Sequence, residues 1–466
     1  MAQSSLRLWA AGILHAASAA CLEDYSAFRH SCLRGMPNTF RPGVHSADRN
    51  TLLTLIDESI EAVRCCFNLG GRAWELGFDL FWYLERLRVS APDLAQRVAR
   101  DFSNPEDADG SVLYGVFCAP SSCTEKTIAP AALRYLIADI CHLEVERVLA
   151  PDPDLASVVE LGDWANVRVD FVVAGLARCG TTSVESSLFQ HPEIDFTSGA
   201  TGEDYTIFGQ GQQNKFVPTR EQVAFHHSRY AGKNSSSRLL GLKNPGIATY
   251  PLSYYTIWLL RRMKLILVVC DPLGRIEKEF MIYHYCHDDV EAAVLRADTI
   301  PSKHRARKDC DRSIRALSSR QHKGWLLERM ISRHLMELMT LFGHDRLLVL
   351  HRASFRDAPL ETYSHVAKWL GATQPFPEEV IFKRRNFRLG HRTDLCRNVS
   401  LQRTMKRLLA PEYDALLRAL AWQSFTFPQR GAQLELGRKI TRCDMPQELL
   451  AGPCGLIDSS DEGCPT

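Results

Sequence analysis

The sequence has almost no excess of either charge and no long uncharged apolar run. Its 56 lysines and arginines against 54 aspartates and glutamates leave a formal net charge of +2. This balance argues against attraction of the whole protein to nucleic acid, which draws on a large positive charge. Beyond the N-terminus no stretch reaches the roughly eighteen uncharged residues of a membrane-spanning helix, and the chain has no internal repeat. We therefore expect no nucleic-acid partner and no transmembrane span.

Cysteine, in contrast, is plentiful and favours an oxidising compartment. The chain has 15 cysteines, which is many for a cytosolic enzyme. Arg7 precedes a short apolar segment, and small residues then lead to Cys21, a pattern typical of a secretory signal. We predict a signal over residues 1–20 and a location in the Golgi lumen or outside the cell, with an ordinary amphipathic N-terminal helix as the alternative. Sequons at Asn234 and Asn398 are compatible with a glycoprotein.

The most informative segment has the pattern of a buried strand at residues 169–175, followed by a glycine-containing turn and a helix. Glycines at both ends of the turn let successive N–H groups point inward, and the helix adds the positive end of its dipole. Such a turn is typical of a phosphate site. A nucleoside triphosphatase loop carries Lys and then Ser or Thr after its last glycine, whereas here Thr181 and Thr182 follow Gly180. Because the cation stands earlier, at Arg178, and no convincing Mg²⁺ carboxylate is found, an NTPase or kinase is disfavoured.

With its helix ending at His191-Pro192, this segment resembles the 5′-phosphosulfate loop of sulfotransferases, which commonly reads Gly-x-x-Lys/Arg-x-Gly-Thr-Thr before a helix and His-Pro. The resemblance extends over about residues 166–425. It implies an α/β fold with a P-loop-like parallel sheet flanked by helices, and a donor, 3′-phosphoadenosine 5′-phosphosulfate, used without a metal. Short apolar runs at 264–269 and 346–350 are typical of strands buried in such a sheet.

The resemblance assigns roles to individual residues. The 5′-phosphate would be held by the side chains and amides of Arg178, Cys179, Gly180, Thr181, Thr182 and Ser183. A second cation, Lys243, lies in Gly-Leu-Lys-Asn-Pro, which is similar to the family's Lys-x-Pro turn facing the acceptor. Glu203 would be the base that takes the proton of the acceptor hydroxyl, with Asp204 as the alternative. A helix-capping arginine, a solvated lysine and a plain loop acid are the structural alternatives for Arg178, Lys243 and Glu203.

The anchors for the 3′-phosphate depart from the family's pattern. Relatives end the second strand with Arg-x-Pro-x-x-Arg and place a Ser three residues later. Here Arg275 matches, but the first Arg is Cys270 and the Ser is Lys278. Losing an Arg removes charge-assisted hydrogen bonds worth about 1.5–3 kcal/mol each, although Lys278 could restore a point charge. Arg385, in the basic run 383–388, would cover the nucleotide, with a solvated face as the alternative.

Residues 21–150 are predicted to form a smaller, cysteine-containing helical domain before a turn-rich hinge at 150–154. Its apolar stripe has near-helical spacing and indicates core packing; the residues are Trp74, Phe78, Phe81, Trp82, Leu84, Glu85 and Leu87. The string Tyr-Gly-Val-Phe-Cys-Ala-Pro-Ser-Ser-Cys-Thr at 114–124 resembles a motif of the nose-resistant-to-fluoxetine-type extracellular domain. We expect Cys118 and Cys123 to be oxidised; a metal site is the competing interpretation, but no partner pair has the usual spacing.

Residues 156–430 would then form the sulfotransferase-like domain and residues 431–466 a tail. The predicted function is transfer of a sulfuryl group to a hydroxyl or amine, with a carbohydrate as the expected acceptor and a small molecule as the other. The rival is a binding protein or catalytically impaired enzyme on the same fold, because Cys270 and Lys278 alter the donor site. The sequence identifies neither the acceptor, the disulfide pairing nor the oligomeric state.

Overall fold

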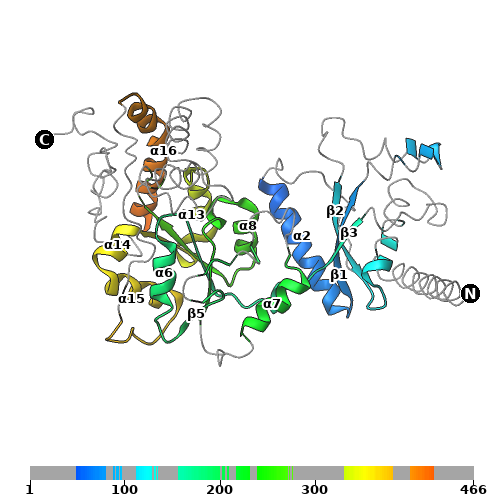
Figure 1. Ribbon diagram of the computed structural model, residues 1–466, viewed down its shortest axis with the longest axis horizontal. Coiled ribbons are helices and arrows are strands. Elements are labelled where there is room, and N and C mark those ends of the chain that lie inside the picture. Colours follow the sequence, from blue (N-terminus) through cyan, green and yellow to red (C-terminus); the bar gives the residue numbers. More distant parts are fainter. Residues whose placement is uncertain are drawn as a thin grey trace, which may run out of the picture. The chain divides into compact units, whose positions relative to one another are not determined.

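The computed structural model places the described residues in two compact units, residues 1–167 with 211–231 and residues 168–210 with 232–466 (Figure 1). The described residues are 49–79, 85, 88–89, 91–93, 95–96, 112–128, 131–132, 134, 156–199, 202–204, 207–208, 217–230, 239–270, 272, 275, 330–380, 382 and 399–423. The predicted signal at 1–20, the hinge at 150–154 and the tail at 431–466 lie outside them. Among them, no helix is both long and apolar enough to cross a membrane.

The first unit is built on a three-stranded antiparallel sheet of order β2-β1-β3. Its elements are α2 (Arg49–Asn68), β1 (Arg72–Asp79), β2 (Val112–Ala119), β3 (Ala156–Glu160) and α7 (Arg220–Tyr230). Helix α2 packs on β1 and β2 because Ile56, Ile60 and Val63, spaced three or four residues apart, share one buried face. A disulfide joins Cys66 at the end of α2 to Cys118 of β2, and Cys65 and Cys123 are disulfide-bonded as well.

The helical stripe predicted from Trp74 onward is wrong over residues 74–79, which belong to the central strand β1. Trp74 and Phe78 lie four residues apart, and this spacing fits the period of two in a strand as well as a helical turn. Pairing decides between them, since β1 is hydrogen-bonded to a strand on each side. Phe81, Trp82, Leu84 and Leu87 lie outside the described residues.

The second unit contains a five-stranded sheet of order β5-β6-β4-β7-β8, in which every pairing is parallel. Its strands are β4 (Phe171–Gly175), β5 (Ile194–Phe196), β6 (Leu239–Lys243), β7 (Lys264–Val269) and β8 (Leu347–His351). All residues of β4 and β8 are buried, as expected for parallel strands covered on both faces. The predicted parallel α/β sheet is therefore confirmed.

Two groups of helices flank this sheet. Helix α6 packs on β4 and contacts α15, while α13 packs on β7 and β8 and contacts α8 and α16. The bounds are α6 (Thr181–Leu188), α8 (Pro251–Leu259), α13 (Ser332–Arg346), α14 (Arg352–Asp357), α15 (Pro359–Leu370) and α16 (Val399–Gln423). Helix α16 also lies along β8, where Gln423 accepts a hydrogen bond from the N–H of Val349 (3.0 Å).

Because the strands are parallel, the carboxyl ends of the neighbouring strands β4, β6 and β7 lie at the same end of the sheet. From β4 the chain runs to β5 and β6 on one side and then to β7 and β8 on the other, so β4 ends at a topological switch point. Open parallel sheets bind ligands in the crevice beyond the carboxyl ends of the strands at such a point. The turns after β4, β6 and β7 carry the residues predicted to act on the donor.

Candidate anion-binding and catalytic site

The turn after β4 has the strand, turn and helix geometry that the sequence predicts. Gly175 ends β4 at φ 145°, and a Cβ there would lie 2.6 Å from the carbonyl oxygen of Val268. The N–H of Leu176 donates to that same oxygen at 3.1 Å. Only glycine allows this close approach, so the turn leaves the sheet directly against β7.

Arg178 and Gly180 give the turn its shape. Arg178 has φ 73° and Gly180 has φ 105°, so a non-glycine residue adopts the left-handed conformation, which is uncommon. The side chain of Arg178 is exposed and forms no ion pair with any residue that the structure describes. Gly180 is the N-cap of α6 and offers no side-chain cap, so the first N–H groups of the helix point toward the turn. The arrangement suits an anion beside Arg178.

Lys243 ends β6, next to β4, and its side chain is only 1% exposed. Its ammonium nitrogen lies 3.2 Å from the hydroxyl of Thr182 and 2.8 Å from a carboxylate oxygen of Glu185. A carboxylate oxygen of Glu203 is 4.0 Å away. Thr182, Lys243 and Glu203, which are predicted from separate parts of the sequence, are therefore brought together. Lys243 is not a solvated surface lysine.

Glu185 is a member of this cluster that sequence reasoning missed. It lies in α6, one turn after Thr181 and Thr182, is fully buried and accepts a hydrogen bond from the hydroxyl of Ser198 at 3.1 Å. Burial raises the pKa of the Glu185 carboxyl, while Lys243 and Ser198 act in the opposite direction. The available signal was its helical spacing, which puts residue 185 on the face of Thr181 and Thr182.

The segment carrying the two candidate bases is held against the end of β6. The amide of Asn244 donates to the carbonyl oxygens of Asp204 (3.3 Å) and Phe208 (3.0 Å), and the N–H of Asp204 donates to the carbonyl of Lys243. The side chain of Asp204 is buried, whereas that of Glu203 is 39% exposed and nearer to solvent. Glu203 thus combines access with proximity to the ammonium of Lys243.

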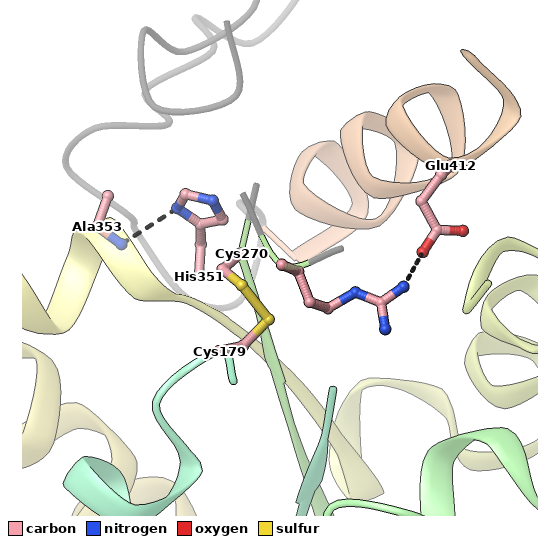
Figure 2. Close-up of a disulfide and its surroundings, with 6 residues drawn as sticks. Cys179, Cys270, His351, Ala353 and Glu412 are labelled. Atoms are coloured by element: carbon pink, nitrogen blue, oxygen red, sulfur yellow. Dashed lines mark hydrogen bonds and ion pairs between the residues drawn. A yellow bond between two sulfur atoms is a disulfide. The ribbon is translucent and has the colours of Figure 1, made fainter. Parts of the chain in front are cut away.

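A disulfide links the turn after β4 to the end of β7. Cys179 and Cys270 are bonded with their Cα atoms 5.2 Å apart, and both are buried (Figure 2). The sequence predicts Cys179 among the phosphate-binding residues and has Cys270 where relatives carry arginine, but it does not identify the partner of either cysteine. Because both sulfur atoms take part in the disulfide, neither side chain keeps an S–H group that could donate a hydrogen bond to a phosphate.

Arg275, five residues after Cys270, forms a buried ion pair. Its guanidinium nitrogen is 3.8 Å from a carboxylate oxygen of Glu412, and both side chains are almost fully buried (Figure 2). Glu412 also accepts hydrogen bonds from the N–H groups of Ile331 (3.0 Å) and Ser332 (2.9 Å) at the start of α13. Binding of the 3′-phosphate by Arg275 stays a prediction, and Lys278 and Arg385 lie outside the described residues.

His351, at the end of β8, is paired with Val269, the residue that precedes Cys270 of the disulfide (Figure 2). Its Nδ1 accepts a hydrogen bond from the N–H of Ala353 at 3.2 Å and so caps α14. Burial lowers the pKa of His351 to about 4, and the neighbouring Arg356 and Arg352 add to this effect. The imidazole is therefore neutral at physiological pH and contributes no charge to the edge.

The start of α6 and the turn before it thus present an exposed guanidinium in the turn and, near Thr182, a buried ammonium and a partly exposed carboxylate. These groups can bind an anion and move a proton. In the described part of the chain, no group of three or more His, Cys, Asp or Glu side chains is arranged to hold a metal ion.

No protein-family model and no curated protein matches the sequence. Solved structures do show a distant likeness. A sulfotransferase from Alicyclobacillus acidocaldarius is 16% identical with a TM-score of 0.36, and the match covers 55% of this chain and 99% of that one. The sulfotransferase domain from the curacin biosynthetic pathway is 13% identical (TM-score 0.27; 46% and 76% covered). That from the Synechococcus PCC 7002 olefin synthase is also 13% identical (0.26; 52% and 95%).

Proposed function

We propose that the second unit is a sulfotransferase that moves a sulfuryl group from 3′-phosphoadenosine 5′-phosphosulfate to a hydroxyl or amine, with a carbohydrate as the expected acceptor. The observation that carries the proposal is the contact of Lys243 with Thr182 at the start of α6, beside the exposed Arg178. The ammonium of Lys243 lies at the first turn of α6, and Arg178 lies in the turn that precedes this helix, where the donor's 5′-phosphosulfate would bind. The residues of the turn fit the phosphosulfate group, because backbone amides and cationic side chains are sufficient to bind its negative charge.

Each residue then has a defined task. Arg178 and the amides of the turn bind the 5′-phosphate. Lys243 stabilises the negative charge that develops on the phosphate oxygen as its bond to sulfur breaks. Glu203 accepts the proton of the acceptor hydroxyl as the oxygen attacks sulfur. Glu185 touches no substrate and is a positioning residue, since its buried carboxylate fixes the ammonium of Lys243 beside Thr182.

A second candidate function, nucleotide or glycan binding without turnover, is favoured by one observation. Cys270 is bonded to Cys179, and Arg275 faces Glu412, so two positions expected to read the 3′-phosphate are already engaged. A donor site with a weak 3′-phosphate anchor would bind its nucleotide less tightly, by about 1.5–3 kcal/mol for each lost charge-assisted bond. Turnover of the donor separates the two functions.

The experiment that tests the proposal compares nucleotides by thermal shift and calorimetry. 3′-Phosphoadenosine 5′-phosphate should raise the melting temperature, because a ligand at roughly one hundred times its Kd adds about 2.7 kcal/mol to native stability. ATP and ADP should do so less. Transfer of radiolabelled sulfate to a panel of glycans then separates an enzyme from a binding protein. Equal stabilisation by all three nucleotides would refute the proposed donor.

We also propose that the protein works in the secretory pathway. Two disulfides with both partners among the described residues are compatible with an oxidising lumen. Secretion from a eukaryotic host should yield a chain beginning near Cys21, and an intact Met1 terminus would contradict the signal at 1–20. The relation of the first unit to the nose-resistant-to-fluoxetine-type domain is part of this proposal and rests on the motif at 114–124.

A further inference from the structure

We infer that the Cys179–Cys270 disulfide is a positioning element that preorganises the anion-binding turn. The inference rests on the proposed function of that turn, and it assigns to the disulfide the task of holding Arg178 and the amides at 179–181 ready for an anionic ligand. Cys179 lies between Arg178 and Gly180, so the covalent link meets the turn at its centre.

The turn needs such a restraint. Arg178, a non-glycine residue, is left-handed at φ 73°, a conformation that persists only where the surroundings enforce it. Backbone hydrogen bonds fix the start of the turn, from Leu176 to Val268 and from Cys179 to Leu176, both at 3.1 Å. After Cys179 the disulfide and the ring of Phe355, which a Cβ on Gly180 would approach to 3.0 Å, flank the turn until the carbonyl of Gly180 accepts hydrogen bonds from Ser183 and Val184 of α6.

The other end of the link is a rigid anchor. Cys270 directly follows β7, which is paired with β4 on one side and β8 on the other, up to Val269 opposite His351. The two cysteines are 0% and 3% exposed, so neither sulfur is open to solvent thiols. The disulfide is therefore a permanent covalent cross-link of the folded protein and not an exposed redox switch.

A turn ordered in advance binds more tightly, because its conformational entropy is lost on folding and not on binding. The test removes both cysteines at once, Cys179→Ala/Cys270→Ala, which leaves no unpaired thiol. Calorimetry well below the melting temperature should show at least tenfold weaker binding of 3′-phosphoadenosine 5′-phosphate than in wild type. Amide hydrogen exchange over residues 176–183 should be at least tenfold faster.

The matched control is Cys66→Ala/Cys118→Ala, which removes a disulfide of the first unit. It should lower stability but change neither nucleotide affinity nor exchange at residues 176–183. To distinguish positioning of Arg178 from a purely structural role of the Cys179–Cys270 disulfide, Arg178→Ala is introduced both into wild type and into the Cys179→Ala/Cys270→Ala protein. If the disulfide positions Arg178, this substitution should weaken binding less in the disulfide-free protein than in wild type, and an equal loss in both would overturn the inference.

Unchanged affinity and unchanged exchange in the alanine pair would also overturn it while leaving the proposed function intact. If wild type binds no nucleotide, the proposed function fails, and the exchange measurement alone then decides whether the disulfide holds the turn. Should the alanine pair not fold, Cys179→Ala/Cys270→Val refills the buried volume and is measured in the same way.

Discussion

The buried pair of Lys243 and Glu185 allows chemistry and stability to be separated by mutation. Lys243→Met leaves the Glu185 carboxyl buried without its cation, and Glu185→Gln leaves the buried ammonium with only the more distant, partly exposed carboxylate of Glu203. Removing one partner of a buried ion pair costs about 3–5 kcal/mol of unfolding free energy. Lys243→Ala would therefore lower the free energy of unfolding as well as the turnover rate, whereas substitution of a solvated lysine would leave the stability nearly unchanged.

The double variant Lys243→Met/Glu185→Gln removes both charges and keeps both shapes. Its free energy of unfolding should return to within about 1 kcal/mol of wild type or rise above it, because two desolvated charges are no longer buried. Its turnover should stay low by about 10²–10³-fold, since the cation that stabilises the transition state is gone.

Urea unfolding followed by tryptophan fluorescence gives the stabilities, and release of the desulfated nucleotide gives the rates. Wild-type turnover in the double variant would remove Lys243 from the chemistry. If the double variant is as unstable as the single ones, the contact between the two side chains is not what holds the strand end to α6.

Three further predictions concern single groups at the same edge. Arg178→Ala should lower turnover by orders of magnitude while changing the free energy of unfolding by at most about 0.5 kcal/mol, because the side chain is exposed; unchanged sulfate transfer would exclude it from the site. Glu203→Gln should lower turnover by about 10²–10⁴-fold, because an amide cannot take the proton of the acceptor hydroxyl, and a rate loss seen only in Asp204→Asn would move the role of base by one residue. Below pH 6.5 the unfolded chain takes up a proton that buried His351, with its pKa near 4, does not, so acidification toward pH 4 should lower the free energy of unfolding by up to about 3.4 kcal/mol. His351→Asn, which can still cap α14, should flatten this dependence, whereas exposed His365→Gln should not.

The sequence predicted what is local or periodic. The turn at 175–180 and its helix follow from glycines and threonines within a few residues, and the apolar run at 264–269 is strand β7 with those bounds. Residues 74–79 were misassigned because a spacing of four satisfies two periods, and only the strands on either side of β1 resolve the ambiguity.

The contacts that sequence reasoning missed join distant positions. The disulfide spans 91 residues, and no spacing rule selects Cys270 among 14 possible partners of Cys179 when the chain has 15 cysteines. Glu412 meets Arg275 only because α16 returns to α13. Glu185 is the intermediate case, since its helical position was readable but its burial depends on Lys243 from another strand.

The hydrogen bond of Gln423 to strand β8 bears on self-association, because it occupies a backbone N–H group that another chain could otherwise bind. Among the strands that the structure describes, β8 is the last of its sheet, and an exposed edge offers unpaired N–H and C=O groups to any other chain that can add a strand. The side chain of Gln423 occupies the N–H of Val349 in the middle of that edge, while α16 lies along the strand. A chain shortened before residue 423 would lose this hydrogen bond, so we expect it to be more prone to intermolecular β-pairing and aggregation.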